Sequence, residues 1–339
     1  MNLPHSLKPA AVFLMGPTAS GKSALAMRIT QYFPVEIISV DSAQIYRYMD
    51  IGSAKPDHAA QKAVPHHLID LLDPTERYSA ARFRNDTLIA MRAIVSRGRI
   101  PLLVGGTMMY FNTLRGGLAE LPSADESLRA ELKQTARTEG WQAMHSRLQQ
   151  LDPVTAARIQ PGDSQRIQRA LEVCYLTGKP MSVLLAQARE EGLRNGFPYR
   201  IINIALLPSD RAALHYRIEQ RFEKMLTTGL VEELSAIRKR FPVTAEMPAM
   251  RCVGYRQAWH YLDNQINLAK MRETGVIATR QLAKRQLTWL RSMHDLQSFD
   301  CLAPGLSEQV IDYLSGSLKG LSNTCDGDAG EISFKDGNA

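Results

Sequence analysis

The chain has 339 residues, of which 45% are hydrophobic and 22% charged, which excludes the disordered and fibrous classes and predicts more than one compact unit. No apolar run approaches the ~20 residues that span a bilayer, and no signal-peptide pattern opens the sequence, so we expect a cytoplasmic protein without a membrane anchor. The four cysteines form no CxxC pair, so we expect reduced thiols and neither disulfides nor a zinc knuckle. The net charge of +7 is explained by solubility alone unless the excess is clustered, which would indicate a polyanionic partner.

Short apolar runs alternate with helical patterns in the first part of the chain and again after residue 198. The runs are fully apolar, as in strands covered on both faces, and their alternation with helices predicts a parallel α/β sheet. Ser79 can cap one helix, which ends near Arg97 with Gly98 beyond it. In chain order we expect strands at 10–15, 36–40, 101–104 and 199–207, with helices after residue 22, from 79 to about 97 and after Asp210.

The segment between the third and fourth expected strands contains helical patterns only, broken by Gly and Pro turn signals. We therefore predict a core in two parts, residues 1–120 and 199–315, with a helical insertion at 121–198. After Phe241 the second part of the core is expected to stay helical to about Leu314. Residues 316–339 are rich in Gly, Ser and Asp and are expected to be disordered.

Residues 16–23, GPTASGKS, match the phosphate-loop pattern G-x4-G-K-[ST] in its required place between a strand and a helix. The glycines let backbone N–H groups turn inward as an anion nest, and the helix N-terminus adds partial positive charge. Lys22 adds a full charge, and the Ser23 hydroxyl can bind Mg²⁺, the expected cofactor and its expected ligand. We predict that the whole loop binds a di- or triphosphate: Gly16, Pro17, Thr18, Ala19, Ser20, Gly21, Lys22 and Ser23.

The surroundings of this loop favour group transfer over hydrolysis. The Asn-Lys-x-Asp motif of GTPases is absent, and the third strand ends in Gly-Gly-Thr at 105–107 where motor and transporter ATPases usually carry a carboxylate. Asp41 directly follows the second strand, which predicts a carboxylate near the phosphates. It is a Mg²⁺ ligand, a general base or the cap of the following turn.

Eight motifs occur in the order found in bacterial tRNA dimethylallyltransferases, and residues 10 to about 300 resemble that family. Three departures, Ser23 and Ser53 where Thr is common and Met108-Met109 where Gly-Leu is frequent, remove no charged or catalytic group. The resemblance implies a P-loop NTPase-like parallel sheet core with an inserted helical domain that binds tRNA. The motifs are GPTASGKS at 16–23, DSAQIY at 41–46, GSAKP at 52–56, PHHLID at 65–70, GGTMMY at 105–110, RIQRALEV at 166–173, RCVGYR at 251–256 and TRQLAKRQLTWLR at 279–291.

The resemblance further implies that the loop holds dimethylallyl diphosphate rather than ATP. The N6 amine of adenine 37 in the anticodon loop of tRNA then attacks C1 of the allyl chain, giving N6-isopentenyladenosine and diphosphate. In the family's pattern Asp41 is the catalytic base, Thr107 contacts substrate near the amine, and Arg217 contacts the diphosphate. We expect a monomer whose partners are these two substrates.

Positive charge is concentrated between Arg251 and Arg291, where eight basic residues face two acidic ones, so six of the seven net charges lie there. Arg280 and Lys284 are one helical turn apart, a spacing at which like charges repel unless an anion such as an RNA phosphate is bound. A solvated helix face is the alternative. With the family positions, the predicted tRNA contacts are Asp41, Ser42, Ala43, Gln44, Thr107, Arg129, Gln165, Arg166, Ile167, Gln168, Arg169, Arg251, Cys252, Val253, Gly254, Tyr255, Arg256, Arg280, Lys284 and Arg285.

Two other functions remain open from the residues alone. A small-molecule P-loop kinase would share the strand, loop and helix and the Asp after the second strand, but would need neither the basic helix nor Gly-Gly-Thr. An RNA-binding protein that uses nucleotide as a switch would need a hydrolytic carboxylate or sensing loop, which the sequence does not offer.

Overall fold

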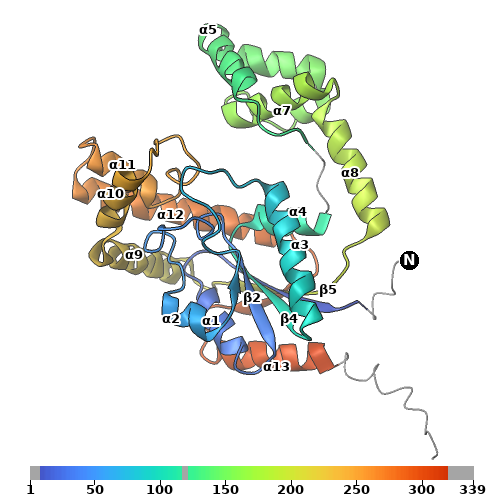
Figure 1. The fold of residues 1–339 in the computed structure, drawn as a ribbon, viewed down its shortest axis with the longest axis vertical. Helices are drawn as coiled ribbons and strands as arrows, with labels where there is room; N and C mark the ends of the chain where they lie inside the picture. Colours follow the sequence, from blue (N-terminus) through green and yellow to red (C-terminus); the bar gives the residue numbers. More distant parts are fainter. Residues whose placement is uncertain (1–7, 117–120, 320–339) are drawn as a thin grey trace, which may run out of the picture. The chain divides into compact units, whose positions relative to one another are not determined.

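A computed structural model describes residues 8–116 and 121–319 of the chain, without the side chains of 192–195 and 319 (Figure 1). The chain divides into two compact units, one formed by residues 111–198 and the other by the segments before and after it. The insertion was predicted to begin at 121. The boundary instead falls within helix α4 (Met108–Gly116), which starts in the core unit and ends in the insertion.

The core unit is built on a six-stranded sheet in the order β3-β2-β4-β1-β5-β6, and every strand pair is parallel, as predicted. The four expected strands are present within a residue or two. Two short edge strands were missed, and the prediction of continuous helix from 242 to 314 is wrong at β6, whose polar, half-exposed residues give no apolar run. The strands are β1 (Ala10–Met15), β2 (Val35–Val40), β3 (His66–His67), β4 (Ile100–Gly105), β5 (Arg200–Leu207) and β6 (Gln297–Asp300).

Strand register brings three loops to one edge of the sheet. Met15 of β1 and Val40 of β2 are both in register with Gly105 of β4, their shared neighbour. The segments that begin at Gly16, Asp41 and Gly106 therefore leave the sheet side by side at its carboxyl end, where α/β proteins bind ligands.

Helices of the core unit begin where the sequence offers caps. The Ser79 side chain accepts a hydrogen bond from the backbone of Arg82, and Asp210 caps the helix after β5 in the same way. The helices are α1 (Lys22–Ile29), α2 (His58–Ala63), α3 (Ala80–Ser96), α4, α9 (Arg211–Thr228), α10 (Leu230–Arg240), α11 (Tyr255–Leu262), α12 (Leu268–Arg291) and α13 (Leu306–Lys319). None of the described helices is long and apolar enough to cross a membrane.

Helix α13 packs with α1 against β1, β4 and β5 in the main hydrophobic cluster. The helix continues to Lys319, so the prediction of disorder from residue 316 is wrong for residues 316–319. The partly buried Leu318 packs against the same cluster and holds this turn in place. The rest of the expected disordered tail, 320–339, lies outside the described residues.

The insertion unit is helical, as predicted from its pattern: α5 (Glu126–Leu151), α6 (Pro153–Ala156), α7 (Ser164–Thr177) and α8 (Met181–Asn195). Gly140, with φ of 83°, interrupts α5 at one of the glycine turn signals of the sequence. Apolar side chains of α5, α6 and α7 form a core of their own, which includes Met144, Leu148 and Ile167. The carboxylate of Glu172 is fully buried, and both Arg129 and Arg169 pair with it.

Helices α9 and α12 approach closely at Gly275. A Cβ at this position would lie 2.0 Å from the ring of Phe222 on α9. Leu214, Ile218 and Leu287 continue the apolar contact between the two helices. Glycine is therefore required at 275 by the proximity of α9.

We predict that Gly275→Ala lowers the stability of the core unit. Overpacking costs about 1–3 kcal/mol, which exceeds the roughly 1 kcal/mol that alanine gains over glycine inside a helix. Gly316→Ala in α13 is the matched control, because a Cβ there meets no atom. Urea denaturation should show destabilisation for the first and up to about 1 kcal/mol of stabilisation for the second; stabilisation of both would contradict the close packing of α9 on α12.

Candidate active site

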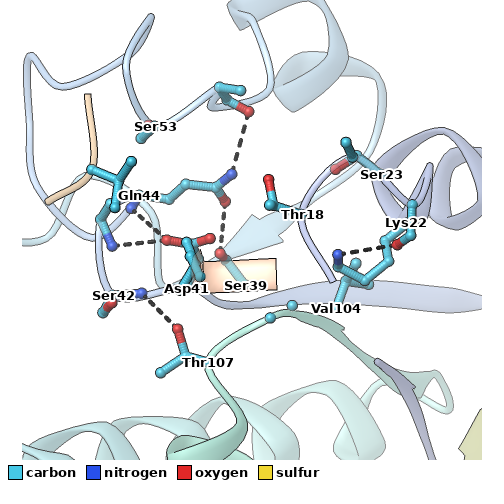
Figure 2. Close-up of a pocket in the computed structure, with 18 of the residues that line it drawn as sticks. Thr18, Lys22, Ser23, Ser39, Asp41, Ser42, Gln44, Ser53, Val104 and Thr107 are labelled. Atoms are coloured by element: carbon cyan, nitrogen blue, oxygen red, sulfur yellow. Dashed lines mark hydrogen bonds between the residues drawn. The ribbon is translucent and has the colours of Figure 1, made fainter. Parts of the chain in front are cut away.

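A cavity of about 1190 Å³ opens at the carboxyl edge of the sheet, entirely within the core unit. Its walls come from the phosphate loop, from residues 41–44 after β2, from 105–109 after β4, and from α9 and α12. Figure 2 shows Asp41, Ser42 and Gln44 on one side of this pocket and Lys22 and Ser23 on the other. The sheet thus brings a phosphate loop and a carboxylate to one space, as the sequence predicted.

The phosphate loop has the backbone that its sequence requires. Gly21 caps α1 in the left-handed region, with φ of 83°, and Ala19 has φ of 64°. At Gly16 a Cβ would lie 2.8 Å from the Ser20 hydroxyl, so glycine permits the tight turn. Residues 18–23 line the cavity, whereas Gly16 and Pro17 form the base of the turn without lining it.

The Lys22 ammonium group is folded onto its own loop. It donates to the Pro17 carbonyl at 2.6 Å and lies 3.4 Å from the Ser20 hydroxyl (Figure 2). Burial, together with the nearby Arg221 guanidinium, lowers the pKa of Lys22 to about 7, while Asp41 acts in the opposite direction. Two cations thus share one poorly solvated space, an arrangement that a bound anion would stabilise.

Asp41 uses its two carboxylate oxygens differently. Oδ1 accepts hydrogen bonds from the backbone N–H groups of Ala43 (2.8 Å) and Gln44 (3.4 Å), which is the turn cap weighed from the sequence. No described residue donates a hydrogen bond to Oδ2. The turn therefore fixes the orientation of the carboxylate and leaves one oxygen for a substrate.

Thr107 is joined to the Asp41 segment across the strand ends. Its hydroxyl oxygen accepts from the Ser42 N–H at 3.2 Å, and its own N–H donates to the Val40 carbonyl at 3.2 Å. The Gln44 amide connects the same segment to the end of β2, because it accepts a hydrogen bond from the Ser39 hydroxyl at 2.8 Å. The structure therefore brings the two predicted catalytic residues, Asp41 and Thr107, onto adjoining segments that both line the cavity.

The arginine predicted to contact diphosphate is displaced by one helical turn. Arg217 does not line the cavity; it donates to the Cys301 carbonyl at 3.0 Å. Arg221, on the next turn of α9, lines the cavity and is close enough to Lys22 and Asp41 to interact electrostatically with both. Burial lowers the pKa of Arg221 and the Asp41 carboxylate raises it. Helical spacing does not reveal which of two arginines four residues apart faces the sheet edge; the structure places Arg221 in the cavity lining, and the diphosphate contact of Arg217 stays a prediction.

The RCVGYR motif is only partly exposed to the cavity. Its first three residues, Arg251, Cys252 and Val253, line it. Tyr255 is fully buried and donates to the Glu233 carboxylate at 2.6 Å, and Gly254 is buried beside it, so direct RNA contacts predicted for these two are wrong. Arg256 is exposed but lies outside the cavity lining.

Glu233 connects the RCVGYR motif at 251–256 to the GSAKP motif at 52–56 through hydrogen bonds. Besides Tyr255, its carboxylate accepts from the backbone N–H groups of Ile51 (2.7 Å) and Gly52 (3.2 Å). A Cβ at Gly52 would lie 2.5 Å from the Tyr255 ring. The two motifs therefore form one packed unit behind the cavity, a role that the sequence did not indicate.

The basic face of α12 is less uniformly charged than the sequence suggested. Arg280 pairs with Glu219 of α9 at 3.4 Å, so its repulsion with Lys284 is relieved within the protein and requires no bound anion. Lys284 and Arg285 are exposed, and no carboxylate among the described residues pairs with them. Arg285 lines the cavity mouth beside Trp289.

The predicted RNA contacts in the insertion divide into three groups by their exposure. Ile167 is fully buried in the insertion core, so a direct RNA contact there is wrong. Arg129 and Arg169 are held by Glu172, and Gln168 donates to the Arg129 carbonyl at 2.9 Å. Their side chains are partly exposed on the surface of the insertion. Gln165 and Arg166 are exposed.

Two oxygen donors of the cavity suit a magnesium ion. Among the described residues, no group of three or more His, Cys, Asp or Glu side chains could form a protein-only metal cage. The exposed Ser23 hydroxyl and the Asp41 carboxylate both line the cavity. One or two oxygen ligands beside a diphosphate and water match the way Mg²⁺ is usually held, so these residues fit the ion.

Comparisons with known proteins give a consistent family. The IPP transferase family model matches residues 44–293, and the isopentenyl transferase model matches residues 9–73. A tRNA dimethylallyltransferase of Nitrosomonas eutropha is 65% identical to this chain, and the match covers 93% of this chain and 98% of the relative. The tRNA dimethylallyltransferase of Ralstonia nicotianae is 53% identical, with the same 93% of this chain and 98% of the relative covered. A crystal structure of tRNA isopentenylpyrophosphate transferase from Bacillus halodurans matches with a TM-score of 0.67 at 33% identity, and the match covers 93% of this chain and 98% of that chain. A eukaryotic dimethylallyltransferase acting on tRNA matches with a TM-score of 0.76 at 26% identity, and the match covers 91% of this chain and 80% of that chain.

Arg221→Ala should weaken the binding of inorganic diphosphate by about 10- to 100-fold, the loss expected for charge-assisted hydrogen bonds in a poorly solvated site. Arg217→Ala, on the same face of α9 one turn away, should bind within about twofold of the unmodified protein, because Arg217 contacts a carbonyl outside the cavity. Isothermal titration calorimetry of both variants checks the assignment. The opposite ranking would return the diphosphate contact to Arg217.

Proposed function

Because this chain belongs to the tRNA dimethylallyltransferase family, we propose that it transfers the dimethylallyl group of dimethylallyl diphosphate to N6 of adenine 37 in the anticodon loop of tRNA. The observation that carries this proposal is the shared cavity, in which the phosphate loop and Arg221 face the Asp41 and Thr107 segments across one sheet edge. A leaving-group site and a base are thereby held within one space.

In the proposed reaction the diphosphate is bound by positive and N–H groups that meet its growing charge. Lys22, Arg221 and the backbone N–H groups of the loop are the protein's contribution. A Mg²⁺ ion held by Ser23, by the diphosphate and by water would supply further neutralisation of that charge. The protonated lysine is the form that binds, and a bound diphosphate favours protonation of a group whose pKa is otherwise near 7.

The transfer itself exchanges one bond for another. The lone pair of N6 forms a bond to C1 of the allyl group, the C1–O bond breaks, and its electron pair leaves on the diphosphate. The amine then carries an extra proton, which passes to Oδ2 of Asp41. An exocyclic purine amine is a weak nucleophile, so a carboxylate that is already oriented by the Ala43 and Gln44 N–H groups is useful in this position. Thr107 lies on the adjoining segment, where its hydroxyl can orient the amine.

Access for RNA is supported by the cationic side chains around the cavity. Arg251 and Arg285 line it, and Lys284 is exposed one residue away. The adenine would have to leave the anticodon loop stack to enter, as in other enzymes that act on a base. Gly-Gly-Thr at 105–107 contributes no carboxylate for activating water, which agrees with transfer to an amine rather than hydrolysis.

Asp41→Asn should lower kcat by about 10²- to 10⁴-fold, the usual contribution of a general base, while keeping the turn. The Asn side chain can accept the same hydrogen bonds from the backbone as Oδ1 does but cannot take the amine proton. Steady-state transfer to an anticodon stem-loop measures the loss, and RNA affinity should stay within a few-fold.

Asp41→Ala serves as the comparison, since it removes both the base and the turn cap. If Asp41→Asn retained nearly full kcat while Asp41→Ala lost it, Asp41 would be a turn cap only and the proposed base would have to be sought elsewhere.

Lys284→Ala combined with Arg285→Ala should weaken binding of the anticodon stem-loop and flatten the plot of log K against log salt by about 0.7–0.9 for each RNA phosphate that the protein no longer neutralises. Affinity for dimethylallyl diphosphate should change little. Arg280→Ala is the control on the same helix, and because Glu219 already pairs with Arg280, its salt slope should equal that of the unmodified protein. An unchanged slope in the double variant would remove this face of α12 from the RNA-binding surface.

A further inference from the structure

The side-chain amide of Gln286 joins two walls of the cavity. Gln286 lies on α12 and is only 8% exposed. Its Oε1 accepts from the backbone N–H of Thr18 in the phosphate loop at 2.8 Å, and its Nε2 donates to the carbonyl of Gly106 after β4 at 2.9 Å. Both functional ends of one amide are thus used, each on a different segment.

The backbone around this amide is shaped to admit it. A Cβ at Gly106 would lie 2.3 Å from Nε2 of Gln286, so the second glycine of Gly-Gly-Thr is needed for the amide to reach the carbonyl. Ala19, the next residue of the phosphate loop, packs against the apolar cluster of α9 and α12 that includes Ala283 and Leu287. The phosphate loop is therefore held against α12 at two consecutive residues, by a hydrogen bond at Thr18 and by packing at Ala19.

The contacts continue from Gly106 to the carboxylate. Thr107 follows directly, and its hydroxyl oxygen accepts from the N–H of Ser42, the residue after Asp41. A short series of hydrogen bonds thus runs from the loop proposed to hold the leaving group, through Gln286, to the segment proposed to hold the base. Gln286 is the member of this series that bridges the gap between the two.

We propose that Gln286 is a positioning residue for group transfer, which fixes the spacing between the diphosphate loop and the Asp41–Thr107 segments. This inference rests on the proposed function. Gln286 acts on the reaction through Thr18 and Gly106 and not by contact with the reacting atoms. The competing explanation is that the amide only satisfies two backbone groups and stabilises the packing of α12.

The test compares Gln286→Met with Gln281→Met. Methionine keeps the length of glutamine but removes both hydrogen bonds, and Gln281 is an exposed glutamine on the same helix. We expect Gln286→Met to lower kcat for transfer to an anticodon stem-loop by about 10- to 100-fold, as for other small misplacements of reacting groups. Binding of the stem-loop and of inorganic diphosphate should remain within about threefold of the unmodified protein. Gln281→Met should be unchanged in all three measurements.

A second variant separates positioning from stability and applies even if Gln286→Met folds poorly. Gln286→Glu places a carboxyl group between the same partners. When protonated it offers one donor and one acceptor, as the amide does, and when ionised it offers no donor to the Gly106 carbonyl. Burial favours the protonated form of a carboxyl, so the kcat of this variant relative to the unmodified enzyme should rise as pH is lowered.

The outcomes are distinct. Absence of transfer by the unmodified protein would refute the proposed function before Gln286 is considered. Transfer by the unmodified protein, with Gln286→Met equal to Gln281→Met in kcat, would overturn the positioning role. A Gln286→Glu ratio that does not vary with pH would overturn it as well, and a fall in melting temperature with no change in kcat would leave α12 packing as the only role of the amide.

Discussion

The constraint on which the site depends lies at the carboxyl end of β4, where a Cβ on Gly105 would be 2.0 Å from the carbonyl oxygen of Val40. No other residue type fits between β4 and β2 at this point. Because Met15 is also in register with Gly105, the three segments that carry the phosphate loop, Asp41 and Thr107 leave the sheet together. A shift of one strand by a residue would separate the proposed base from the diphosphate loop and turn its side chain to the other face.

The electrostatics of the cavity follow from the close approach of these three segments. Lys22 and Arg221 share a poorly solvated space with Asp41, and burial lowers the pKa of both cations. Such an arrangement costs stability in the absence of a ligand and becomes favourable when a dianion is bound, which is the behaviour expected of a site prepared for a leaving diphosphate. On the outside of the same helices the positive charge is partly neutralised, since Glu219 and Glu223 of α9 pair with Arg272 and Arg280.

Several family motifs prove to be packing motifs as much as catalytic ones. Glu233 gathers the N–H groups of the 50–52 loop and the Tyr255 hydroxyl, and Lys55 is almost completely buried between Asp50 and Asp70. Gln286 likewise links two loops from a helix far away in the sequence. These side chains hold the loops that line the cavity, so selection for the reaction would act on them without any contact with substrate.

The sequence by itself determined the parallel sheet, the phosphate loop, the position of Asp41 at a strand end and the helical nature of the insertion. Each of these is encoded locally, in an apolar run, a glycine spacing or a cap such as Ser79. Sequence alone did not separate Arg221 from Arg217, because two arginines one turn apart are equivalent until α9 is packed on α12. It placed Ile167 and Tyr255 at the RNA, because a motif does not show which of its side chains are buried. It also gave no sign of the contacts of Gln286 and Glu233, or of the pairing of Arg280 with Glu219, because these interactions join residues far apart in the chain and exist only once the helices have packed.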